Sequence, residues 1–80
     1  METQPKKTQT LDCQGLLCPM PIIKLSKAIK AIGIGDSIEM LATDPGSVPD
    51  MAAFQKQTGH KILNSSQQGA VYRFVVQRTK

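Results

Sequence analysis

The stretch from Leu11 to Gly33 reads LDCQGLLCPMPIIKLSKAIKAIG, and its composition changes halfway along. The first half carries two cysteines and two prolines, whereas in the second half apolar residues recur with the period of an α-helix. A glycine then follows at a position where glycines commonly end helices. The stretch therefore predicts a helix over residues 19–32 that ends at Gly33. Its predicted buried stripe consists of Ile22, Leu25, Ile29 and Ile32, with Ala28 beside it.

A second helix is predicted over residues 47–58, after a turn at Asp44, Pro45 and Gly46. Ser47 can cap its start, Asp50 occupies the acidic position three residues later, and a glycine lies past its end. Pro49 falls in the first turn, where its missing amide proton costs nothing. The predicted buried side chains of this helix are Val48, Met51, Ala52 and either Phe54 or Gln55.

Four short segments alternate apolar and polar residues or are rich in strand formers, which predicts strands. Ordered along the chain with the helices, they give βαβαββ, with a turn at residues 67–69 before the last strand. Because helical crossovers between parallel strands are right-handed, both helices should lie on one face of the sheet. The expected fold class is α+β, a two-layer α/β sandwich with a four-stranded mixed sheet under two helices. The predicted strands cover residues 8–12, 37–43 (with Ile38, Met40 and Ala42 on one face), 61–65 and 71–77.

Length and composition limit the classes of function. We expect residues 1–7 to form a flexible N-terminal tail and residues 8–80 a single domain. No stretch approaches the roughly 20 apolar residues of a membrane span, and the N-terminus lacks the apolar run of a secretory signal, so we expect a cytoplasmic monomer. The net charge is +4, but the basic residues are scattered and aromatics are only 4%, which argues against direct nucleic-acid binding.

Cys18 is the candidate reactive residue, because Pro19 places it at or next to the start of the first helix. If Pro19 is the first helical residue, the thiol faces the positive end of the helix dipole, with the amides of Met20 and Ile22 nearby. Such positions lower cysteine pKa values, so we expect a thiolate that can act as a nucleophile or sulfur carrier. Gly15, Pro19 and Pro21 are the expected supports of this geometry.

Cys13 is a possible accessory, since a turn at Gly15 would let it approach Cys18. The alternatives are a redox-active Cys13/Cys18 dithiol and a plain buried residue at the end of a strand. The two cysteines and His60 offer three soft ligands at most, without the paired spacings of zinc sites, so no metal and no cofactor are assigned. His60 is expected to be a turn residue after the second helix.

Four residues of the first helix form a candidate rim for partner docking. Met20 and Ile23 are apolar but fall on the solvent-exposed face of the predicted helix, beside Lys24 and Lys27. An apolar pair beside a reactive sulfur is typical of a surface that contacts another protein.

The signature Leu-Asp-x-x-Gly-x-x-Cys-Pro-x-Pro resembles that of the TusA/SirA-like family of small sulfur-carrier proteins. The resemblance covers about residues 10–78 and implies the same βαβαββ sandwich. It also implies a carrier-type sulfurtransferase in place of a free-standing enzyme. Cys18 would accept sulfur as a persulfide from a cysteine desulfurase or rhodanese and relay it to an acceptor protein, as in tRNA thiolation or other sulfur trafficking. The redox dithiol and, less favoured, a basic module that binds nucleic acid or a regulator remain alternatives. The signature residues are Leu11, Asp12, Gly15, Cys18, Pro19 and Pro21.

Overall fold

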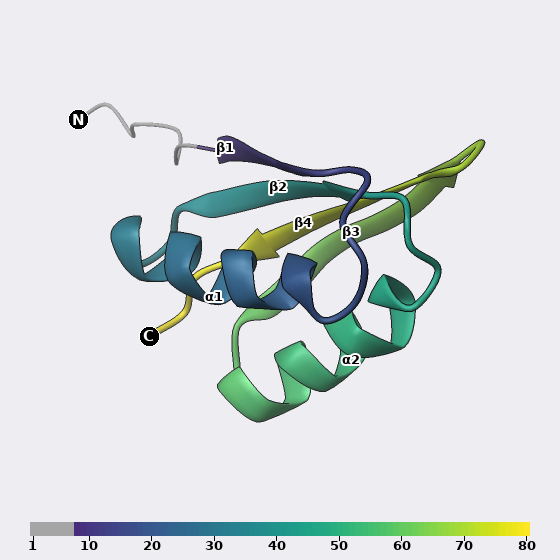
Figure 1. The fold of residues 1–80 in the computed structure, drawn as a ribbon. Coiled ribbons are helices and arrows are strands. Elements are labelled where there is room, and N and C mark those ends of the chain that lie inside the picture. The colour runs from purple at the N-terminus through teal and green to yellow at the C-terminus, as the bar shows by residue number, and fades with distance from the viewer. Residues whose placement is uncertain (1–7) are drawn as a thin grey trace.

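The computed structural model describes residues 8–80, and the predicted N-terminal tail, residues 1–7, lies outside the described residues. Its elements follow the predicted order βαβαββ (Figure 1). Neither helix in the described part of the chain is long and apolar enough to cross a membrane. The elements are β1 (Thr8–Cys13), α1 (Met20–Ala31), β2 (Ser37–Ala42), α2 (Ser47–Thr58), β3 (Lys61–Gln68) and β4 (Val71–Gln77).

The four strands form one mixed sheet in the order β1-β2-β4-β3. β1 runs parallel to β2, whereas β4 is antiparallel to both β2 and β3. Both helices cover the same face of this sheet (Figure 1). The predicted fold class, a two-layer α/β sandwich, is therefore confirmed.

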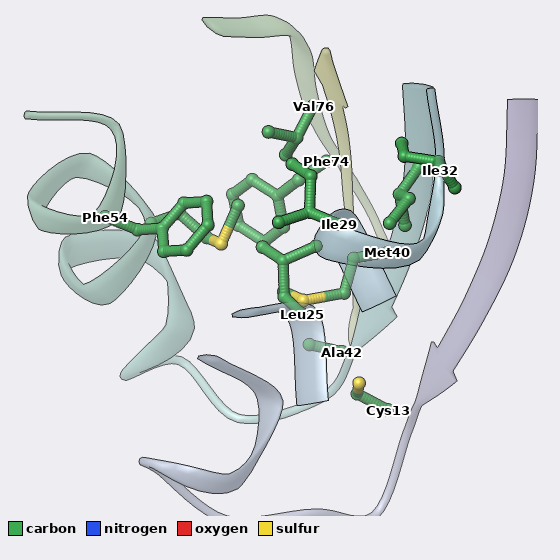
Figure 2. Packing of buried hydrophobic residues seen from close by; sticks show 11 residues of the cluster. Cys13, Leu25, Ile29, Ile32, Met40, Ala42, Phe54, Phe74 and Val76 are labelled. Atoms are coloured by element: carbon green, nitrogen blue, oxygen red, sulfur yellow. The ribbon is translucent and has the colours of Figure 1, made fainter. Parts of the chain in front are cut away.

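The core lies between the helices and the two central strands (Figure 2). Alternation along β2 places Ile38, Met40 and Ala42 inward, as predicted, because successive side chains of a strand point to opposite faces. α1 presents Leu25 and Ile29 to this sheet, while Ile22 is only half-buried. The other buried apolar side chains include Cys13, Pro21, Ile32, Met51, Phe54, Phe74 and Val76.

The predicted bounds of α2 are confirmed, but the capping role of Ser47 and part of the buried stripe were wrong. Ser47 does not cap the helix; the N-cap residue is Gly46, which makes no side-chain cap bond, and the Ser47 hydroxyl donates to the Asp44 carbonyl oxygen. Ser47 is thus the first helical residue and is buried, so the inward stripe runs through positions i, i+4 and i+7 from it. Met51 and Phe54 fall on that stripe as predicted. Val48, Ala52 and Gln55 are exposed instead.

The two helices end in different ways. Gly59 closes α2 with a left-handed φ of 81°, as expected of a C-terminal glycine. Gly33 follows α1 but does not adopt a positive φ. The last carbonyl groups of α1 are bonded instead by the Arg78 guanidinium, which donates to the oxygens of Lys30 and Ile32. A positive charge at a helix C-terminus also interacts favourably with the negative end of the helix dipole.

The C-terminal hairpin is longer than predicted. β3 extends to Gln68, not to residue 65, and only Gly69 and Ala70 form the turn. The polar run at 64–68 gives no apolar alternation, so the sequence pattern had placed the turn too early. The register between β3 and β4 shifts between Ile62 and Asn64, which marks a β-bulge in the edge strand.

Candidate functional site

Cys18 lies in a tight turn that leads from β1 into α1. The Met20 amide donates to the Leu17 carbonyl oxygen at 2.8 Å, and the Cys18–Pro19 peptide bond inside this turn is cis. Pro19 is the N-cap residue of α1, with its carbonyl oxygen accepting from the Ile23 amide at 3.2 Å. Pro19 was predicted at the first helical position, so the helix begins one residue later than expected. Cys18 stands next to the N-cap and its side chain is exposed.

The remaining signature residues shape the loop around this turn. Gly15 has a φ of 82°, a left-handed conformation that favours glycine, and its amide donates to the Thr43 hydroxyl at 2.9 Å. Residues 13–16 form a turn in which the Leu16 amide donates to the Cys13 carbonyl oxygen. Pro21 packs into the interior at the first turn of α1. The loop is thus tied to the end of β2 on one side and to the core on the other.

Asp44 connects the Cys18 loop to the start of α2. One oxygen of its carboxylate accepts from the Cys18 backbone amide at 2.8 Å, and the other accepts from the Gly46 amide at 3.2 Å. Gly46 lies so close to the site that a β-carbon on it would stand 3.5 Å from the Cys18 β-carbon. Asp44 therefore fixes the position of Cys18 through the backbone.

Asp50 contacts the sulfur itself. The Cys18 thiol donates a hydrogen bond to the Oδ2 atom of Asp50, which lies in the first turn of α2. This hydrogen bond, with loss of hydration and the negative charges of Asp50 and Asp44, raises the pKa of the Cys18 thiol. The expected lowering was wrong because two carboxylates beside the thiol favour its protonated form, and because the Met20 amide is already bonded to Leu17.

The raised pKa predicts how Cys18 reacts with a small electrophile. Only the thiolate is nucleophilic, so the rate of alkylation by iodoacetamide should rise with pH to a midpoint above that of a cysteine peptide blocked at both ends. At neutral pH Cys18 should react more slowly than that reference thiol. Intact mass recorded at timed intervals across a pH series measures the rate. A midpoint below that of the reference would instead indicate the activated thiolate expected from the sequence.

Neither Asp44 nor Asp50 was among the predicted site residues. Asp44 was assigned to a turn, and Asp50 to a capping box with Ser47. Because Ser47 does not cap α2, the Asp50 carboxylate is available to the thiol. Both residues lie close to the start of α2. This clustering was the sequence signal that could have suggested a role at the Cys18 site.

Cys13 is placed differently from Cys18. It ends β1 opposite Ala42 and is fully buried in the core, where burial raises the pKa of its thiol (Figure 2). Both cysteines are free. This placement supports the plain buried strand-end residue over the redox-active pair with Cys18.

His60 is a turn residue after α2, as predicted, and lies at the opposite end of that helix from Asp50. Its Nδ1 atom accepts from the Thr79 amide at 3.1 Å, and its ring packs near Phe54. Burial, followed by the charges of Arg78 and Lys80, lowers the pKa of this imidazole. Within residues 8–80, no three His, Cys, Asp or Glu side chains gather in a way that could hold a metal ion.

The predicted docking rim forms one exposed face of α1 that starts beside Cys18. Met20 and Ile23 are 43% and 42% exposed, and Lys24 and Lys27 lie on the same face at helical spacing. Leu17, which sequence reasoning did not select, is 73% exposed immediately before Cys18. We refer to Leu17, Met20, Ile23, Lys24 and Lys27 together as the apolar-basic rim.

A groove separates α1 from α2 beside the sulfur. Its volume is about 250 Å³, and it extends from Pro19 and Asp50, the neighbours of Cys18, to Phe54 and Thr58 on α2. The candidate site thus combines an exposed thiol, two carboxylates, the apolar-basic rim and an open groove.

Comparison with known proteins identifies the family to which this chain belongs. The family model described as sulfurtransferase TusA matches residues 9–78, which span all six elements but the first residue of β1. The protein belongs to the TusA family of sulfur carriers. Within that family, the sulfur carrier protein TusA of Allochromatium vinosum is 41% identical over 71 residues, covering 89% of this chain and 93% of that protein. A relative from Neisseria meningitidis serogroup A is 46% identical over 70 residues, covering 88% and 95%.

A solved structure supports the TusA fold independently. The SirA-like protein of Desulfitobacterium hafniense superposes with a TM-score of 0.76 at 20% sequence identity, covering 89% of this chain and 97% of that one. The resemblance drawn from the Cys-Pro-x-Pro signature is therefore confirmed for family and fold.

Proposed function

We propose that Cys18 accepts sulfur as a persulfide from a donor protein and relays it to an acceptor protein. The observation that carries this proposal is the exposure of Cys18 in a chain whose only other cysteine is buried in the core. A thiol that passes sulfur between two proteins has to be reachable by both of them. Membership of the TusA family supports the same role.

The proposed transfer conserves atoms and electrons. The Cys18 sulfur attacks the outer sulfur of the donor persulfide, the donor's S–S bond breaks, and the donor leaves as a thiolate that takes up a proton. Cys18 then carries a persulfide, and the acceptor's nucleophile removes the outer sulfur in the second step. Since sulfane sulfur only changes its carrier, neither step consumes an oxidant or a cofactor.

The apolar-basic rim is the proposed contact surface for both partners. Met20 and Ile23 offer apolar area beside the sulfur, while Lys24 and Lys27 favour an acidic border on the partner. The donor would be of the cysteine desulfurase or rhodanese type. The acceptor decides whether the sulfur enters tRNA thiolation or another route. The carrier would act as a monomer in the cytoplasm through transient contacts.

Sulfur loading can be measured directly. Incubated with a cysteine desulfurase and cysteine, the protein should gain about 32 Da, one sulfur atom, and lose it again on reduction with dithiothreitol. Peptide mapping of the blocked persulfide should place the added mass on the peptide that contains Cys18. A protein that stays at its original mass with both a desulfurase and a persulfidated rhodanese would contradict the proposed function.

A further inference from the structure

We propose that Asp50 is a second catalytic residue of the carrier, which takes the proton of Cys18 during sulfur loading and returns a proton to the donor's departing sulfur. This inference rests on Cys18 being the sulfur acceptor. It assigns the acid–base step of the transfer to a residue of the carrier itself.

The geometry singles out Asp50 among the groups around the sulfur. Its Oδ2 atom accepts the hydrogen bond of the Cys18 thiol, so the proton already lies on the path between the two groups. Asp44 accepts from the Cys18 backbone amide instead, which positions the residue without touching its sulfur. Asp50 also lines the groove beside Pro19, where the outer sulfur of a donor can approach.

The charges around the sulfur explain why a proton acceptor is needed. Asp50 faces the thiol from α2 and Asp44 faces it from the loop before α2, and both favour the protonated sulfur. On α1, the positive charge of Lys24 lowers the pKa of Cys13, but no positive charge contributes to the shifted pKa of Cys18. The one salt bridge within residues 8–80 joins Arg73 to Glu39, so no cation is paired with Asp50. The resting sulfur is therefore a neutral thiol, which has to lose its proton before it attacks.

The proposed step balances as follows. As the Cys18 sulfur attacks the outer sulfur of the donor persulfide, its proton passes to the Asp50 carboxylate. The S–S bond of the donor breaks, and the departing thiolate takes the proton from Asp50. The products are the Cys18 persulfide and the donor thiol, with Asp50 again ionised. The inner sulfur of Cys18 then has no proton to donate, so the loaded sulfur is released from its hydrogen bond to Asp50.

The test compares two reactions of Asp50→Asn, which keeps the size of the side chain but cannot take up a proton. Loading is followed by intact mass at pH 7 with glutathione persulfide as a defined donor, and alkylation is followed with iodoacetamide. Loading should slow by about a hundredfold or more, the low end of acid–base effects. Alkylation, in which iodide leaves without taking up a proton, should become faster because a negative charge beside the thiol is removed. Asp50→Glu should load faster than Asp50→Asn, since it restores a carboxylate.

Opposite changes in the two rates would support proton transfer by Asp50. If Asp50→Asn loads as fast as the wild-type protein or faster, the proposal is wrong, because Asp50 would then only restrain the thiol. A fall in both rates would also overturn it and mark a structural role. Glu39→Gln, which removes one negative charge on β2 away from Cys18, is the matched control and should leave both rates unchanged. Failure of the wild-type protein to load would contradict the proposed function instead.

Discussion

Cys18→Ser is expected to abolish sulfur loading completely. Serine preserves the size and exposure of the side chain, but a hydroxyl cannot form a persulfide. With a cysteine desulfurase and cysteine, the variant should therefore keep its original mass, whereas the wild-type protein gains about 32 Da. Intact mass spectrometry of both proteins after the same incubation measures the difference.

Cys13→Ala is the matched control for this result. Cys13 is buried in the core, so its removal should lower stability modestly but leave sulfur loading in place. An equal gain of mass on Cys18→Ser would show that another group accepts the sulfur. Loss of loading in a folded Cys13→Ala variant would instead restore the dithiol alternative.

Phe74→Ala is expected to cause the largest loss of stability. Phe74 lies on the central strand β4, is only 2% exposed, and fills the space under both helices (Figure 2). Truncating a buried phenylalanine removes its transfer free energy and leaves a cavity, which costs about 3–5 kcal/mol. Because a small domain is stable by only about 5–15 kcal/mol, a large part of its free energy of unfolding would be lost.

Urea unfolding followed by circular dichroism measures this change. Leu63→Ala on β3 is the control, since Leu63 is 53% exposed and its truncation should change the free energy of unfolding by less than about 0.5 kcal/mol. Similar losses for the two variants would indicate that Phe74 does not hold the two layers together.

Local patterns were sufficient to predict most elements of the fold. The apolar period of α1 and the alternation in β2 are visible within a few residues, and both elements were found with nearly correct bounds. The cap of α2 was misjudged because the Ser47 hydroxyl bonds to the Asp44 carbonyl oxygen, a contact that has no signature in the sequence. The length of β3 depends on its pairing with β4, which the polar run at residues 64–68 does not reveal.

The chemistry of the site was harder to predict than its position. Cys18 was proposed from its prolines, and it is exposed, as a reactive thiol has to be. The sign of its pKa shift was wrong because Asp50 is 32 positions away in the sequence, and the contact exists only once α2 packs beside the Cys18 loop. A helix start considered alone favours an anion, but a second helix can bring carboxylates that reverse the preference.

The β-bulge in β3 affects how the edge of the sheet can pair with another strand. An edge strand exposes unpaired amide and carbonyl groups, which the edge of another molecule can extend into a continuous sheet. Here the register shift between Ile62 and Asn64 interrupts the regular spacing that such pairing requires, and residues 64–68 are exposed and polar. The edge formed by β3 is therefore poorly suited to pairing with the same edge of a second molecule.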